Sequence, residues 1–385
     1  MNKKFLKGFA AGLFLAFILS TFILWLMIRD RKLNIPYGRN AMTVRLDDIQ
    51  DYIDQFYLND YVDEDLYNGA YKGYVEGLGD KYSAFYPKRD LQEVKDELNS
   101  NIVGIGVYMT IDSEENRPKI TKAIAGEGAA KNGVEEGDIL LEIDGTDTLD
   151  MPLEVAEEML QGYGATTVTL KIKRGTEELT IDVKRRAADI IYVEQKMLDN
   201  NVGYVKIYRF DGATVGQFSS AVDELTENGA KALIIDLRGN PGGDTNATAR
   251  ICDRFLEAGK LVMYAVDKKG RRDEYKSSDD ITLDIPVAFL MDKGSASSSE
   301  VMVGCLKYYL SDSKIFGETS FGKGIMQTTY LMNGGSIKLT TAYWYTPDGV
   351  CIHHKGFEPD FPVEDDPETE NDEVIDEAVK YLAAK

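Results

Sequence analysis

A cluster of serines and one glycine-flanked lysine are the residues of this chain whose types and spacing could do chemistry. The serines lie in Ser295-Ala-Ser-Ser-Ser-Glu300, directly after the hydrophobic stretch 285–291, and the lysine lies in Phe321-Gly-Lys-Gly-Ile325. A serine hydroxyl is a poor nucleophile unless a base removes its proton, and a neutral lysine amine can be that base. The two stretches therefore predict a serine nucleophile served by a lysine.

A lysine base must be neutral at the working pH, which requires desolvation to lower its pKa well below the free value. The glycines beside Lys323 and the apolar Phe321 and Ile325 suit a buried lysine in a tight turn. A histidine base has little support, because the two histidines of the chain, His353 and His354, are adjacent. Neighbouring residues of a strand point to opposite faces and do not converge on one centre.

Two other short patterns contain Lys323, and both are discounted. Residues 317–323 fit a GxxxxGK phosphate loop, but Gly324 replaces the Ser or Thr that would bind magnesium, and 325–330 reads as a strand instead of a helix. The SxxK motif of penicillin-binding enzymes occurs at Ser320–Lys323 and again at Ser311–Lys314, but neither SDN nor KTG accompanies it.

Bulk composition limits the partners and the cofactors. The chain has 385 residues, enough for two or three domains, and its net charge of −21 disfavours nucleic acid and anionic lipid as partners of the soluble part. A protein or peptide partner is favoured instead. The three cysteines are far apart in the sequence and form neither a disulfide framework nor a zinc site, so no metal and no cofactor is expected.

The N-terminus carries the membrane signal of the sequence. Gly8 to Ile28 contains no charged residue and, at about 1.5 Å per residue, is long enough to span the hydrocarbon core of a bilayer. A cleaved signal peptide is the alternative, but the run exceeds the usual apolar region and lacks an A-x-A-like site. We predict a cytoplasmic stub and transmembrane anchor over 1–28. Basic residues on both sides leave the orientation open.

Five further regions follow from changes in the composition and periodicity of the sequence. Residues 29–42 read as a linker, and 43–101 as a helical region whose simplest role is packing or dimerisation. Residues 102–186 consist of short strands with one amphipathic helix at about 152–160, and 187–365 alternate strands and helices in the βαβ manner of a layered α/β core. Its continuous apolar strands imply a sheet covered on both faces. Residues 366–385 read as an acidic linker and a terminal helix.

The strand-rich region, with its glycine-rich turn at Gly104-Ile-Gly-Val107 leading into a strand, resembles a PDZ domain. The resemblance implies that the backbone N–H groups of Gly104, Ile105, Gly106 and Val107 bind the C-terminal carboxylate of a peptide, which adds as a strand beside 107–109. The alternative is a PDZ-shaped module that only packs against its neighbour.

The later motifs resemble the carboxyl-terminal processing peptidases, also called tail-specific proteases. The resemblance runs from about residue 45 to the end and rests on the serine cluster and four further segments: Asp236-Leu-Arg-Gly-Asn-Pro-Gly-Gly243, Gly317-Glu-Thr-Ser-Phe-Gly-Lys-Gly324, Trp344-Tyr-Thr-Pro-Asp-Gly349 and Gly356-Phe-Glu-Pro-Asp360. It implies Ser297 as the nucleophile, Lys323 as the general base and Gln327 as the residue that orients the lysine. The fourth residue on in a strand shares its face with the first, which fits Lys323 and Gln327.

Acyl transfer also needs hydrogen-bond donors aimed at the developing oxyanion. The backbone N–H of Ser298 and one N–H from Gly242 or Gly243 are the candidates, because glycine lets a backbone approach a substrate closely.

The chain departs from the family pattern at two places. The family usually has alanine where Ser298 stands, which leaves the choice among the four serines of the cluster open. It commonly has Asp-Pro-Tyr-Ser where this chain has Asp80-Lys-Tyr-Ser83, a change expected to affect only the helical region.

The expected protein is therefore of α/β class and multi-domain, with a layered protease core, an inserted PDZ domain, an N-terminal helical region and a transmembrane helix. The resemblance implies a membrane-anchored serine endopeptidase that recognises protein substrates by their free C-termini. It also implies a catalytic part outside the cytoplasmic membrane of a bacterium, and a homodimer. The alternative function is an inactive, anchored PDZ scaffold that binds protein C-termini.

Overall fold

The structure is a computed structural model that describes Thr21 and residues 39–87, 104–161, 166–185, 191–278, 283–332, 334–365 and 371–385. The predicted anchor at 8–28, Thr21 excepted, and residues 88–101 of the predicted helical region lie outside the described residues. No helix within the described ranges is long and apolar enough to cross a membrane. The chain divides into two compact units, Met1–Tyr67 and Asn68–Lys385.

Two helices begin the described chain, as the helical spacing predicts. The helix α2 spans Arg39–Phe56, and α3 spans Asp63–Glu76. Three carboxylates stand in the first turn of α3, where the positive end of the helix dipole favours them. After α3 the predicted helical region also contains a strand, β1 (Ala84–Pro87). It pairs antiparallel with β16 (Gly335–Tyr345), a partner too distant in sequence to be inferred locally.

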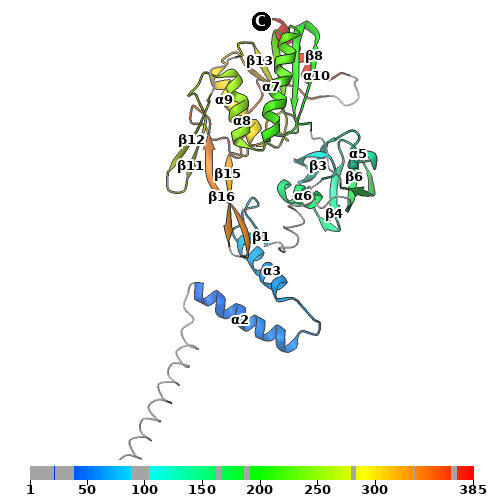
Figure 1. The fold of residues 1–385 in the computed structure, drawn as a ribbon, viewed down its shortest axis with the longest axis vertical. Coiled ribbons are helices and arrows are strands. Elements are labelled where there is room, and N and C mark those ends of the chain that lie inside the picture. The colour runs from blue at the N-terminus through cyan, green and yellow to red at the C-terminus, as the bar shows by residue number, and fades with distance from the viewer. Residues whose placement is uncertain are drawn as a thin grey trace, which may run out of the picture. The chain divides into compact units, whose positions relative to one another are not determined.

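A six-stranded sheet, which includes the β13 and β8 labelled in Figure 1, forms the centre of the core. Its strand order is β17-β14-β13-β10-β9-β8. Its pairings are parallel except for β8 against β9. The strands are β8 (Val193–Leu198), β9 (Val202–Ile207), β10 (Ala232–Asp236), β13 (Val287–Met291), β14 (Lys314–Gly317) and β17 (Phe361–Pro362).

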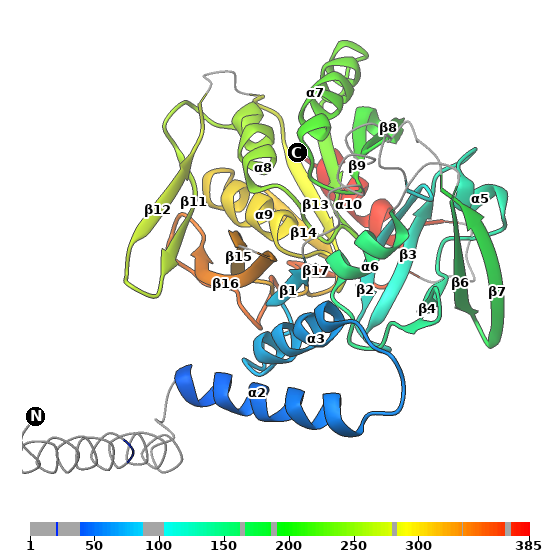
Figure 2. The same cartoon turned by 60° about the horizontal axis from the view of Figure 1, so that its bottom comes forward.

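Helices cover both faces of this sheet, and Figure 2 shows α9 and α10 on opposite sides of β13. One face packs against α7 (Gly212–Glu227), α8 (Thr245–Cys252) and α9 (Ser298–Tyr309), and the other against α10 (Glu373–Ala383). Every residue of β10 and of β13 is buried. The prediction of a layered α/β core with a doubly covered sheet is therefore confirmed.

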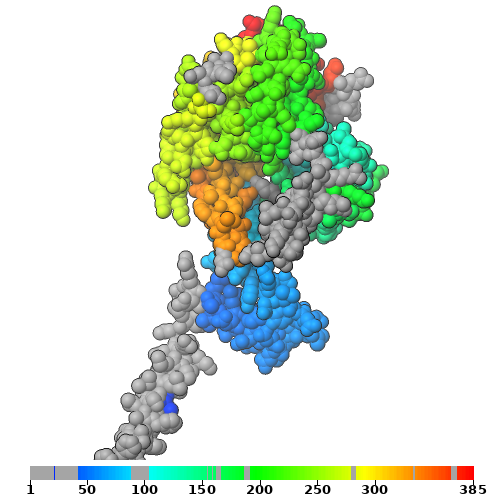
Figure 3. All heavy atoms as spheres, viewed as in Figure 1, coloured from blue at the N-terminus to red at the C-terminus, as the bar shows by residue number. Residues whose placement is uncertain are grey.

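A second, antiparallel sheet extends from the core in the order β1-β16-β11-β12, and β15 (Ile325–Met332) also pairs with β16. The remaining strands are β11 (Leu261–Asp267) and β12 (Arg272–Lys276). The hairpin of β15 and β16 forms the exposed orange surface in Figure 3. Its tip carries Leu331, whose surface is 90% exposed.

The predicted PDZ region forms a separate antiparallel sheet in the order β2-β3-β4-β6-β7, with β5 beside β4 and a hydrophobic core of its own. The strand β2 (Val107–Asp112) lies at one edge, so one side of its backbone is open to an added strand. The other elements are β3 (Arg117–Ala123), α5 (Gly128–Lys131), β4 (Ile139–Ile143), β5 (Thr146–Asp147), α6 (Leu153–Leu160), β6 (Thr167–Arg174) and β7 (Glu177–Lys184).

Candidate active site

Ser297 stands at the turn between β13 and α9, immediately before the first residue of the helix. Its backbone has φ 53° and ψ −113°, a region that non-glycine residues rarely adopt. Such strain persists only where surrounding structure enforces it, and it concentrates at functional sites. A serine on a sharp strand-to-helix turn also resembles the nucleophile elbow of other hydrolases.

The other serines of the cluster are buried and bound to backbone carbonyls. Ser295 donates to the carbonyl of Leu237 at 2.9 Å. Ser298 donates to the carbonyl of Gly243 at 2.9 Å, and Ser299 to that of Asn240 at 2.9 Å. These three are at most 1% exposed, whereas Ser297 is half-buried and lines a cavity. The geometry thus distinguishes Ser297, the serine that the family resemblance favours, from the other three.

Lys323 lies in the turn before β15, which begins at Ile325, so it is not a strand residue. The prediction that Lys323 and Gln327 share one face of a strand was wrong, and a register shift between Met326 and Gln327 also breaks the alternation. The turn is formed by Gly322, at φ +83°, and the carbonyl of Lys323 accepts a hydrogen bond from the Trp344 indole at 2.8 Å. Both Lys323 and Gln327 nevertheless line the same cavity as Ser297.

Glu300 joins the serine turn to the lysine turn. Its Oε2 accepts the backbone N–H groups of Ser297 at 2.8 Å and of Lys323 at 2.9 Å. Its Oε1 accepts the hydroxyl of Ser320 at 2.6 Å and the N–H of Gly322 at 2.7 Å. Burial raises the pKa of the Glu300 carboxyl, and these four hydrogen bonds oppose that rise.

Glu300 is a site residue that was not predicted from the sequence. The available signal was its place three residues after Ser297, because a serine followed at that spacing by glutamate is the capping box of a helix N-terminus. That pattern predicts a structural cap and gives no hint that the carboxylate also reaches the lysine turn.

The glycine loop before α8 lies against Ser297. A Cβ on Gly242 would stand 2.8 Å from the nitrogen of Ser298 and 2.9 Å from the Cβ of Ser297. The N–H of Gly242 is bound to the side-chain oxygen of Asn240 at 2.9 Å. In the described part of the chain, no acceptor binds the N–H of Gly243 or of Ser298. Gly243, and not Gly242, is therefore the glycine with a donor available.

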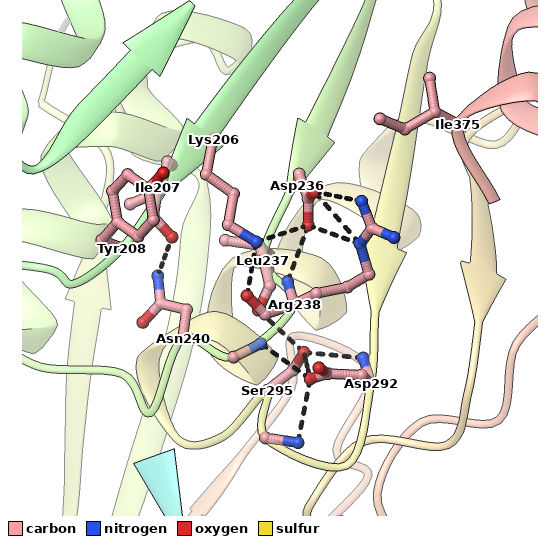
Figure 4. A network of polar contacts seen from close by, with 12 residues as sticks. Lys206, Ile207, Tyr208, Asp236, Leu237, Arg238, Asn240, Asp292, Ser295 and Ile375 are labelled. Atoms are coloured by element: carbon pink, nitrogen blue, oxygen red, sulfur yellow. Dashed lines mark hydrogen bonds and ion pairs between the residues drawn. The ribbon is translucent and has the colours of Figure 1, made fainter. Parts of the chain in front are cut away.

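A polar network holds this loop and the serine turn together (Figure 4). Asp236 binds Arg238 and Lys206, and the ammonium of Lys206 donates to the carbonyl of Arg238 at 2.6 Å. Burial alone would raise the pKa of Asp236, but the charges of Lys206 and Arg238 hold that pKa well below its usual range. Asp292 accepts the N–H of Gly239 at 2.8 Å, which ties the loop to the chain just before the serines.

A cavity of about 350 Å³ contains the candidate site. The core supplies Ser297, Lys323, Gln327, Gly242 and Gly243, all predicted from the sequence. The PDZ domain supplies Ile111 of β2 and the residues around the start of α6, and Glu157 of α6 pairs with Arg209 of the core. The predicted carboxylate loop, Gly104, Ile105, Gly106 and Val107, precedes and begins β2 and is not part of this lining.

Lys81 and Tyr82 also line this cavity. The expectation that the Asp80–Ser83 segment affects only the helical region was therefore wrong. The segment is held against the core because β1, which follows it, pairs with β16, a strand distant in sequence.

Comparisons with known proteins agree with this architecture. The model of peptidase family S41 matches residues 201–363, and the PDZ model matches 92–173. A CtpA-like serine protease of Staphylococcus epidermidis is 31% identical over 91% of this chain and 72% of its own length. The carboxy-terminal processing protease CtpA of Bacillus subtilis is 32% identical over 78% of this chain and 65% of its own length.

Among solved structures, the photosystem II D1 C-terminal processing protease matches with a TM-score of 0.62 and 26% identity, over 77% of this chain and 81% of that one. These matches define the class as serine peptidases, which are hydrolases, with a PDZ domain. The chain belongs to peptidase family S41, among the carboxyl-terminal processing proteases.

Proposed function

We propose that the chain is a serine endopeptidase that processes protein C-termini, with Ser297 as nucleophile and Lys323 as general base. One observation carries the proposal: a single cavity brings together Ser297, Lys323 and Gln327 with the PDZ domain. The burial and backbone bonding of the other three serines support Ser297 as the attacking residue.

The proposed reaction is acyl transfer in two halves. The neutral amine of Lys323 takes the proton of the Ser297 hydroxyl as Oγ attacks the scissile carbonyl, and Gln327 orients the amine. The N–H groups of Ser298 and Gly243 stabilise the oxyanion, aided by the positive end of the α9 dipole. The lysine ammonium then returns a proton to the departing amine, and water hydrolyses the acyl-enzyme by the same steps.

The PDZ domain is proposed to select substrates by their C-termini. The backbone of Gly104, Ile105, Gly106 and Val107 would take the carboxylate, and the peptide would pair with the open edge of β2. The position of β2 at the sheet edge supports this role. Ile111, near the end of β2, lines the catalytic cavity, so a peptide paired with β2 would lie close to it.

Anchoring and location are also proposals. Residues 8–28 would hold the chain in the cytoplasmic membrane as an uncleaved helix, with the catalytic part on the extracytoplasmic side. The charge-free apolar run supports the anchor, and the resemblance to the carboxyl-terminal processing peptidases, which implies an extracytoplasmic catalytic part, supports the side. The same likeness supports a homodimer. An inactive PDZ scaffold is less favoured, because Ser297, Lys323 and Gln327 are all present and line one cavity.

The test of C-terminal selection is cleavage of two versions of one protein with an apolar tail, one ending in a free carboxylate and one in an amide. The full chain, purified in detergent, should cleave the amide at least about tenfold more slowly in kcat/KM, the effect of one lost charge-assisted contact. Gly106→Ala should remove this preference, because Gly106 has φ +78° and its added Cβ would overlap the side chain of Glu127. Equal cleavage of both versions by the unmodified chain would contradict the proposal.

A further inference from the structure

The turn Asp80–Ser83 is a rigid element. The carboxylate of Asp80 accepts the N–H of Tyr82 at 3.0 Å and the hydroxyl of Ser83 at 2.6 Å. An aspartate that binds the backbone two residues on forms an Asx turn, which fixes the intervening chain. The side chain of Tyr82 therefore leaves this turn in a defined direction.

The turn is also fixed to the strands that carry Gln327. The N–H of Thr340 in β16 donates to the hydroxyl of Ser83 at 3.1 Å, and Ser83 is 7% exposed. Thr340 pairs with Gln327 across β15 and β16 and receives its side-chain amide at 3.5 Å. The turn thus keeps a constant position relative to the strand pair at the cavity.

Tyr82 faces the lysine of the site. The Nζ atom of Lys323 lies 5.0 Å from the centre of the Tyr82 ring, and both residues line the cavity. An ammonium within about 6 Å of an aromatic centroid is attracted by the negative face of the ring. The exposed Lys81 approaches the same ring at 5.3 Å.

Resting on the proposed function, we infer that Tyr82 is a positioning residue for Lys323, and that the turn before the PDZ domain completes the site. The backbone of Lys323 is fixed by Glu300 and Trp344, but its four-carbon side chain has many rotamers of its own. The Tyr82 ring restricts that freedom by its bulk while the amine is neutral, and also by its attraction for the charge once Lys323 is protonated. Nζ therefore stays where it can take the proton from Ser297 and return one to the leaving amine. The role is assigned to the ring of Tyr82, because the ring is the part that lies against Nζ.

The test compares Tyr82→Phe with two variants that lack a ring, Tyr82→Leu and Tyr82→Met, in the full chain acting on one protein substrate. Tyr82→Phe should keep kcat within about threefold, whereas each variant without a ring should lose about 30-fold or more in kcat with KM little changed, the result of a misplaced catalytic group. Two variants without a ring are made in case one of them does not fold. The thermal unfolding midpoint of each variant shows whether it is folded.

The matched control is Tyr71→Leu. Tyr71 of α3 packs edge-to-face on Phe85 at 5.2 Å and is outside the cavity lining, so its loss removes an aromatic contact from the same region without touching Lys323. Its kcat should be unchanged. Ser297→Ala is measured alongside: activity that persists in it contradicts the proposed function itself.

Where activity depends on Ser297, three results would overturn the inference alone. These are a retained kcat in a folded variant without the ring, a loss expressed in KM only, or an equal loss in Tyr82→Phe.

Discussion

Ser297 and Lys323 donate their backbone N–H groups to the same atom, Oε2 of Glu300, at 2.8 Å and 2.9 Å. One buried carboxylate oxygen therefore fixes the separation of the two backbones that carry the proposed nucleophile and base. The second oxygen binds Ser320 and Gly322, so the carboxylate meets four donors and acts only as an acceptor. Any change at residue 300 alters both turns together.

Glu300→Gln should inactivate the enzyme while leaving it folded. The amide group brings two N–H donors toward backbone N–H groups, so one side of the site loses its acceptor and the turns separate. We expect kcat to fall about 100-fold, the cost of a displacement near 1 Å, and the free energy of unfolding to fall by about 1–3 kcal/mol. Kinetics on a protein substrate and urea unfolding measure the two effects.

Glu318→Gln is the matched control for that change, because Glu318 lies outside the lining of the catalytic cavity and pairs with Lys293 at 3.5 Å on the surface. It should retain the kcat of the unmodified chain. A Glu300→Gln enzyme with unchanged kcat would show that the shared oxygen does not position the site.

Gly243→Ala tests the oxyanion donor. Gly243 has φ +141°, and its added Cβ would overlap the carbonyl of Phe210, which accepts the N–H of Asp244 at 2.9 Å. The loop must shift, and the Gly243 N–H with it. We expect kcat to fall about 100-fold to 1,000-fold with a smaller change in KM, as for loss of one oxyanion donor.

Gly216→Ala provides the comparison, since Gly216 in α7 has open space around its Cβ position and ordinary helical φ. Alanine there should leave kcat unchanged and stabilise the helix slightly. Equal kcat values for Gly243→Ala and the unmodified chain would show that the Gly243 N–H is not an oxyanion donor.

Much of this arrangement could be predicted from the sequence, because local patterns determine it. The apolar strand before the serines, the glycine loop and the PDZ strands each have a periodicity or turn residues that indicate their structure. The choice of Ser297 had to be carried over from a resemblance, because residue type and spacing alone do not separate the four serines of the cluster. Ser297 is distinguished physically because the other three serines are buried. Their hydroxyls donate to the backbone carbonyls of Leu237, Gly243 and Asn240, which are distant in sequence.

The missed features depend on long-range contacts. Asp80–Ser83 falls in the predicted helical region, and contacts with the sequence-distant β16 bring Tyr82 to Lys323. Lys323 lies in the tight turn that its flanking glycines predict, but its alignment with Gln327 assumed that the strand already includes it. The hydrogen bonds of its turn to Glu300 and Trp344 instead delay the start of β15 by two residues.

Asp236 should make stability depend on pH. Its pKa is lower in the folded chain than in the unfolded chain, so its ionised form stabilises the fold above the unfolded value of about 3.9. That contribution is lost as the pH falls below this value toward the folded pKa. Asp236→Asn should lower the free energy of unfolding at neutral pH by about 3–5 kcal/mol, because Lys206 and Arg238 lose their buried partner, and should flatten the decline in acid.

Urea unfolding between neutral pH and acid pH measures this effect. Asp199→Asn, at an exposed position after β8, controls for the loss of one negative charge and should give a curve parallel to that of the unmodified chain. A curve for Asp236→Asn that is also parallel would show that the Asp236 carboxylate does not contribute the acid-sensitive stability.

The most direct test of the account is the rate of cleavage of one protein with an apolar, free C-terminus by the full chain and by three variants. Ser297→Ala and Lys323→Met should each lose at least about a thousandfold in kcat/KM, since both act in the same proton transfer. Ser298→Ala should stay within about tenfold, because its hydroxyl only donates to the carbonyl of Gly243 and its backbone N–H remains. Full activity in Ser297→Ala or Lys323→Met, or its loss in Ser298→Ala alone, would contradict the Ser297–Lys323 dyad.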